Sequence, residues 1–175
     1  GSLGGALVIG LGELGELSIE SLTEAVRAGV LRYLMQLLDN ESVCGVRVDD
    51  DMRLATLILG YNSTTNISIE ASVGAIVRGT LEANNQFTKR MKRSLRVTDL
   101  EFVELYLDAA ISATKALQRV AGRLNDDAAR HGMRVEAAPT LHLADAEDVA
   151  LFAGLDLAEI AITSGATIEP AAAPN

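Results

Sequence analysis

Three glycines close to the amino terminus, Gly10, Gly12 and Gly15, have the G-x-G-x-x-G spacing of a dinucleotide-binding turn. In that motif the backbone N–H groups of the turn bind a pyrophosphate, and an acidic residue about 20 positions further on binds the ribose. Here the acidic residues Glu13 and Glu16 lie inside the turn, where their charge opposes that of a phosphate. The spacing therefore favours a structural bend over a nucleotide site.

Carboxylates in the second half of the chain are the next candidates for chemistry. Glu101, Glu104 and Asp108 fall where a strand is expected to give way to a helix. Acid–base catalysis needs two such groups held in unlike surroundings. Two interpretations stay open for these residues: a catalytic acid or base, or, in the case of Glu104, a cap on the helix N-terminus.

Cysteine and histidine are too few to support a familiar catalytic or metal site. Cys44, His131 and His142 are the only residues of these two types, and their spacing matches no zinc motif. No serine stands in a G-x-S-x-G sequence, and no Gly-Lys-Ser or Gly-Lys-Thr follows the glycine turn. We therefore predict no catalytic residue, no metal and no cofactor, and we expect Cys44 to be an ordinary buried strand residue.

The overall composition argues against several classes of partner. The 175 residues carry a formal net charge of −9 and include three Tyr, three Phe and no Trp. An acidic chain is repelled by a phosphate backbone, and few aromatic rings are present to stack on bases. No apolar run reaches the ~18 residues that a membrane span needs, and the single cysteine is typical of a reducing compartment. We expect a cytoplasmic protein that binds neither nucleic acid nor membrane.

Hydrophobic periodicity predicts alternating strands and helices. The predicted strands cover residues 7–9, 43–48, 54–60, a stretch that ends near Tyr106, and 133–137, and the predicted helices run from the N-cap Ser18 to about Asp39, from Ser68 to about Met91 and from about Tyr106 to His131. Elements of these lengths indicate an α/β fold, with a three-layer mixed sheet flanked by helices on both faces.

One domain is expected over residues 1–138, followed by a carboxyl-terminal extension or linker over residues 139–175 with low order towards its end. Within the second predicted helix, Asn84 and Asn85 are unusual. Both are weak helix formers whose side chains prefer to bond backbone groups. We expect them to hold a neighbouring loop.

The chain resembles one family of domains. Its segment "GGALVIGLGELGELSIESLTEAVRAGVLRYL" is similar to part of the amino-terminal, macro-like domain of leucyl aminopeptidases. The stretches "VIGLGELGEL", "LILGYNSTTNISIEASVGAIVRGTLEANNQF" and "DLEFVELYLDAAISATKAL" also resemble successive blocks of large bacterial proteins that carry a CHAT domain, a caspase-like peptidase module. The resemblance covers roughly residues 5–120.

This resemblance implies a macro-like domain that is not itself the enzyme. The metal-binding segment of the aminopeptidases, of the "NTDAEGR" type, does not occur in the sequence, and neither Cys44 nor the histidines stand in the context of a caspase-like dyad. No catalytic residue can therefore be carried over from either family. The first strands of the macro-like fold are expected to be missing or to come from another polypeptide.

Three functions follow as expectations. The first is a non-catalytic accessory or regulatory domain for a CHAT-type peptidase in a bacterial effector or defence protein, whose partner is a domain of the same protein, another protein or a second copy of the chain. The second is a macro-like module that binds a nucleotide-derived ligand such as ADP-ribose through the loops of Gly10, Gly12, Gly15, Gly60 and Asn62. The third is an enzyme that uses the carboxylates named above.

Overall fold

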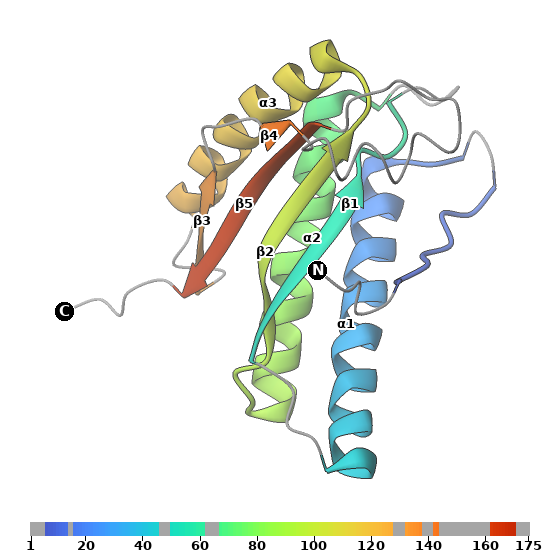
Figure 1. Cartoon of the computed structure of the whole chain (residues 1–175), viewed down its shortest axis with the longest axis vertical. Helices are drawn as coiled ribbons and strands as arrows, with labels where there is room; N and C mark the ends of the chain where they lie inside the picture. The colour runs from blue at the N-terminus through green and yellow to red at the C-terminus, as the bar shows by residue number, and fades with distance from the viewer. Residues whose placement is uncertain are drawn as a thin grey trace.

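The computed structural model describes residues 6–13, 16–45, 50–61, 67–127, 132–137, 142–143 and 162–170. The elements follow the order α1 (Ile19–Cys44), β1 (Asp51–Leu57), α2 (Ile69–Met91), β2 (Arg96–Glu104), α3 (Leu107–Asp126), β3 (Met133–Ala137), β4 (His142–Leu143) and β5 (Ile162–Pro170). They form a mixed sheet with helices packed against it (Figure 1), so the predicted α/β class is confirmed.

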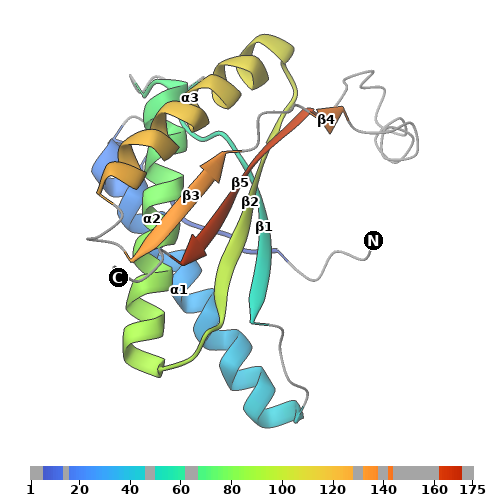
Figure 2. The ribbon, with the colours of Figure 1, turned by 90° about the vertical axis from the view of Figure 1, so that its left-hand side faces the viewer.

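The strand order in the sheet is β1-β2-β5-β3, and the short β4 pairs with β5. β1 and β2 are parallel, whereas β5 is antiparallel to both β2 and β3. Figure 2 shows α1, α2 and α3 on the same side of the sheet. The part of the chain that the structure describes thus forms two layers, one of strands and one of helices. Helices on the other face of the sheet, as expected from the sequence, are not found in this part of the chain.

The position of β5 corrects the expected domain boundary. Residues 162–170 fall in the stretch that was predicted to be an extension or linker, but they pair along β2 on one side and along β3 on the other. This strand therefore joins β3 to the pair formed by β1 and β2. The prediction failed because the sequence "ITSGATIEP" has weak alternation, and its extended conformation depends on its two neighbours.

The predicted ends of the first helix and the strands on either side of it need correction. α1 continues past Asp39 to Cys44 and ends at Gly45, whose positive φ of 68° suits a helix C-cap. Val43 and Cys44 are therefore helical and not part of a strand, while residues 46–49 lie outside the described ones. β1 begins at Asp51, three residues before the expected Leu54.

The apolar stretch at residues 7–9 is extended but is not assigned to a strand. Leu7, Ile9 and Leu11 are half-buried, Val8 is exposed, and the side chain of Ile9 packs on Gly29 of α1. The alternation expected of a strand is present, but no described strand forms a ladder with this segment. The predicted strand at residues 7–9 is therefore not found: the segment packs on a helix and has one face in solvent.

Helix α2 is the central element of the helical layer. It contacts α1 on one side and α3 on the other, and it also lies against the sheet (Figure 1). Its buried residues combine small and large side chains: Ser72, Val73, Ala75, Ile76, Val77, Gly79, Thr80, Leu81, Ala83, Asn84 and Phe87. The predicted helix is confirmed from its N-cap Ser68, which accepts a hydrogen bond from the Ala71 N–H, to Met91.

Two asparagines attach helices to the strands that follow them. The side chain of Asn84 accepts a hydrogen bond from the Val97 N–H at 2.9 Å and donates one to the Val97 carbonyl at 2.8 Å. Asn125 in α3 forms the same pair of bonds with Val135 in β3, at 2.9 and 2.8 Å. Asn84 was expected to hold a neighbouring loop; its side chain does bond a neighbouring segment, but that segment is the start of strand β2 and not a loop.

Glu70 in the first turn of α2 links this helix to α3. Its carboxylate accepts hydrogen bonds from Arg119 and Arg123. The bond from Arg119, followed by the bond from Arg123, holds the pKa of Glu70 below its usual range. The link lies at the solvent-exposed surface, so we expect it to orient α3 more than to stabilise it.

Gly79 allows the close approach of α1 and α2. A Cβ atom at this position would lie 2.7 Å from the Thr23 carbonyl oxygen and 3.0 Å from the Val26 Cβ. Gly79→Ala should therefore lower the free energy of unfolding by about 1–3 kcal/mol, because backbone must move. Gly122→Ala is the matched control, since a Cβ there meets nothing within 4 Å, and should raise stability by up to about 1 kcal/mol. Urea denaturation measures both, and equal effects would contradict the helix contact.

Replacing Asn84 tests its bonds to Val97. Asn84→Ala leaves a buried backbone N–H and carbonyl without partners and should lower the free energy of unfolding by about 2–4 kcal/mol. The neighbouring Asn85→Ala, at a half-buried position, should change it by less than about 1 kcal/mol. If the two variants unfold at the same urea concentration, Asn84 does not hold β2 in the way described.

Candidate functional site

The glycines predicted to bind a ligand lie in two different parts of the structure. Gly12 has a φ of 83° and belongs to the segment beside α1, and Gly60 has a φ of 83° and lies just after β1. Gly10 also lies in the first segment, whereas Gly15 and Asn62 fall outside the described residues. The positive φ values support the interpretation of these glycines as bends.

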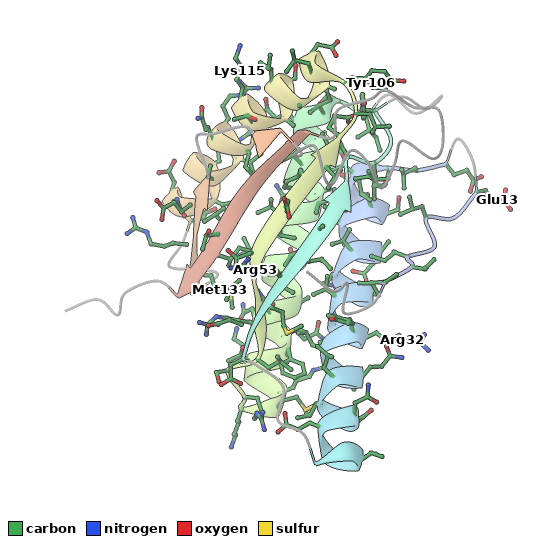
Figure 3. The ribbon with its side chains drawn as sticks, viewed as in Figure 1. Glu13, Arg32, Arg53, Tyr106, Lys115 and Met133 are labelled. Carbon is green, nitrogen blue, oxygen red and sulfur yellow. The ribbon has the colours of Figure 1, made fainter. Side chains whose placement is uncertain are left out.

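The surroundings of these bends offer little support for an anion site. Figure 3 shows Glu13 pointing away from the body of the molecule, so its charge lies at the outside of the turn. Beside Gly60, the Leu59 N–H donates a hydrogen bond to the Ser72 hydroxyl at 3.0 Å. This amide is therefore already used to join the loop to α2, and it is not available to a phosphate.

The carboxylates at the junction of β2 and α3 do not form one site. Glu104 is buried, and its Oε1 accepts hydrogen bonds from the N–H groups of Leu105 at 2.8 Å and Tyr106 at 3.3 Å. Glu101 is exposed on the face of the sheet that faces away from the helices, and Asp108 is exposed in the first turn of α3. Glu104 was expected to cap the helix N-terminus. It caps the turn that leads into α3, up to the N–H of the N-cap residue Tyr106, and among the described residues its hydrogen bonds do not reach the N–H groups of the first helical turn.

The cysteine and histidines are also distributed over the fold. Cys44 is the last residue of α1, and His142 is in β4, whereas His131 lies outside the described residues. Among the residues that the structure does describe, no group of three or more His, Cys, Asp or Glu side chains could hold a metal ion. A shallow hollow of about 300 Å³ is lined by residues of α2 alone: Glu82, Asn85, Gln86, Lys89 and Arg90.

A group of exposed apolar side chains marks the carboxyl end of the parallel strands. We call it the apolar patch; its residues and their exposed fractions are Leu57 (58%), Leu105 (45%), Tyr106 (53%), Leu107 (57%) and Ile111 (39%). Exposed large apolar residues that are scattered singly are normal, and it is the gathering of these five at one edge of the fold that makes them a candidate interaction surface.

The elements of the fold bring these residues to one edge. Leu57 is the last residue of β1 and pairs in register with Val103 of β2. Residues 105–107 then lead from β2 into α3, and Ile111 follows Leu107 by one helical turn. Figure 3 shows Tyr106 at this end of the molecule. In α/β proteins, this edge is where ligands and partners commonly bind.

The boundary between a strand and a helix near Tyr106 was predicted from the sequence, but the apolar patch was not. A signal was present: three large apolar residues stand together where a strand gives way to a helix, a position that usually carries a polar N-cap. Comparisons of the chain with protein-family models, with curated proteins and with solved structures find no match. None of the helices in the described residues is both long and apolar enough to cross a membrane.

Substitutions at Glu104 distinguish a cap from a catalytic group. Glu104→Ala removes the acceptor of two N–H groups at the start of α3 and should lower the free energy of unfolding by about 1–3 kcal/mol. Glu104→Gln retains a carbonyl oxygen and should lose less than half of that amount. Thermal and urea denaturation provide the comparison. Equal losses in the two variants would show that the carboxylate charge, and not the hydrogen bonds, is what α3 needs.

Proposed function

We propose that this chain is a non-catalytic accessory domain that acts by binding another polypeptide. The observation that carries the proposal is the apolar patch, whose five side chains are each more than a third exposed at one edge of the fold. Keeping such a group in water is unfavourable by roughly 25 cal/mol per Å² of apolar surface, and a partner that covers it recovers this energy.

The roles of the candidate catalytic carboxylates agree with this proposal. Glu104 is engaged by backbone N–H groups, and Glu101 belongs to the face of the sheet that is turned away from the helices. Two carboxyl groups that act together as acid and base share one site with the substrate between them. Side chains alternate along a strand, so Glu101 and Glu104 lie on opposite faces of β2.

The resemblance noted in the sequence suggests what kind of protein the partner is. Proteins with the same succession of blocks carry a caspase-like peptidase module, and we propose that this domain regulates or scaffolds such a peptidase in a bacterial effector or defence protein. A regulatory domain of this kind needs a contact surface and no catalytic groups of its own. The apolar patch is the surface that we assign to this contact.

A macro-like module that binds ADP-ribose is the second candidate. Gly60, with its positive φ, lies between the end of β1 and the N-terminus of α2, where α/β proteins bind nucleotides. A thermal-shift titration with ADP-ribose tests this function. A saturable rise in melting temperature that disappears in Gly60→Val would favour the second candidate over the first.

Assays of the purified chain test the non-catalytic part of the proposal. With fluorogenic peptides and an activated ester as substrates, we expect turnover no faster than in buffer. Turnover that is lost in Cys44→Ala, His131→Ala or Glu101→Gln would contradict the proposal. The three variants also serve as each other's controls, because the residues lie in different parts of the chain.

A further inference from the structure

We infer that the partner of the apolar patch is a basic, amphipathic segment of another protein, with apolar residues flanked by Lys or Arg. This inference rests on the proposed function and specifies the chemistry of the partner. Three features of the molecule support it: the charges around the patch, the charge of the chain segment that begins and ends beside the patch, and the charge of a second copy.

Two exposed carboxylates border the apolar patch, and neither has a cationic partner among the residues that the structure describes. Asp108 follows Leu107 directly, and Glu101 precedes Val103 on the open face of the sheet, in register with the uncharged Ala55. Arg119 of α3 pairs with another carboxylate, that of Glu70. A partner with cations beside its apolar residues satisfies both Asp108 and Glu101.

Two cations lie near the acidic border: Arg53, exposed on the open face of the sheet in register with Asp99, and Lys115. Lys115 follows Ile111 by one helical turn and is exposed on α3. Figure 3 places Lys115 and Tyr106 at different ends of the first half of this helix. The cations of the partner are therefore expected to face Glu101 and Asp108, away from Lys115.

The connection between β4 and β5 is the alternative occupant within the same chain. β4 ends at Leu143, which pairs with Ile162 at the start of β5, and Ile162 also pairs with Glu104. Residues 144–161 thus start and finish next to the patch. Their sequence contains Asp145, Glu147, Asp148, Asp156 and Glu159 and no Lys or Arg. These charges have the same sign as the border, so they disfavour this segment as the occupant.

A second copy of the chain is disfavoured for the same electrostatic reason. Each copy has a formal net charge of −9, and a symmetric contact through the patch would place Asp108 and Glu101 of each copy near those of the other. A partner of opposite charge is attracted over a distance and also neutralises the border on binding. The charges therefore select a basic polypeptide among the three possible occupants.

Peptide binding tests the inference. The probe is a fluorescein-labelled peptide of about 15 residues that repeats Leu and Lys at helical spacing, and its control has Glu in place of every Lys. Fluorescence anisotropy should show saturable binding of the Lys peptide to the full chain and no binding of the Glu peptide. Tyr106→Ser combined with Leu107→Ser should raise the Kd at least about tenfold.

Two further variants separate the apolar contact from general charge attraction. Met35→Ser removes a comparably exposed apolar side chain on α1, 42% exposed, and should leave the Kd unchanged. Glu101→Gln combined with Asp108→Asn should raise the Kd severalfold and reduce its dependence on salt. Circular dichroism confirms that each variant is folded before binding is measured.

Four outcomes would overturn the inference. The first is that the Glu peptide binds as tightly as the Lys peptide, and the second is that the patch variant binds like Met35→Ser. The third is a gain in affinity when residues 146–159 are replaced by a Gly-Ser linker, because that segment would then be the occupant. The fourth is a dimer in light scattering that the patch variant dissociates. None of these outcomes depends on the turnover assays, so the non-catalytic part of the proposed function can fail or hold separately.

Discussion

The burial of α2 on three sides is the constraint on which the rest of the structure depends. A helix can be covered by α1, by α3 and by the sheet only if its own side chains are small where the neighbours approach, and Gly79, Ala75 and Ala83 meet this requirement. The two hydrogen bonds from Asn84 then fix where β2 begins. α2 connects β1 to β2 along the chain. It therefore returns the chain to the edge at which β1 began, so that β2 can pair with β1 in parallel.

The same arrangement explains why apolar side chains reach the surface at one edge. The chain passes from β2 to α3 in a short turn, and Glu104 directs its carboxylate inward to bind the N–H groups of that turn. The N–H groups of Leu105 and Tyr106, which lead into α3, are satisfied in this way, and the N-cap residue Tyr106 makes no side-chain cap bond. Residues 105–107 are then free to be apolar, and they extend into solvent beside Leu57. The junction therefore holds its turn with hydrogen bonds and leaves its apolar side chains exposed.

Features with local causes could be predicted from the sequence, and features with distant causes could not. Ser68 caps α2, and the alternation of residues 133–137 gives β3, so both elements were predicted with nearly correct ends. β5 depends on pairing with β2 and β3, which lie far from it in the chain, and its own sequence therefore looked like a linker. The apolar patch was missed for a related reason: periodicity marked the junction at Tyr106 but could not show which side chains the neighbouring elements leave exposed.

The central claim is that the apolar patch serves binding and not folding, and the stability of single variants tests it most directly. Leu107→Ser at the patch and Leu117→Ser in the core remove the same side chain from the same helix, once from an exposed position and once from a fully buried one. By urea denaturation of the isolated chain, we predict a change within about 0.5 kcal/mol for Leu107→Ser and a loss of at least about 3 kcal/mol for Leu117→Ser. A loss above about 2 kcal/mol for Leu107→Ser would show that the patch is part of the core, and it would contradict the account.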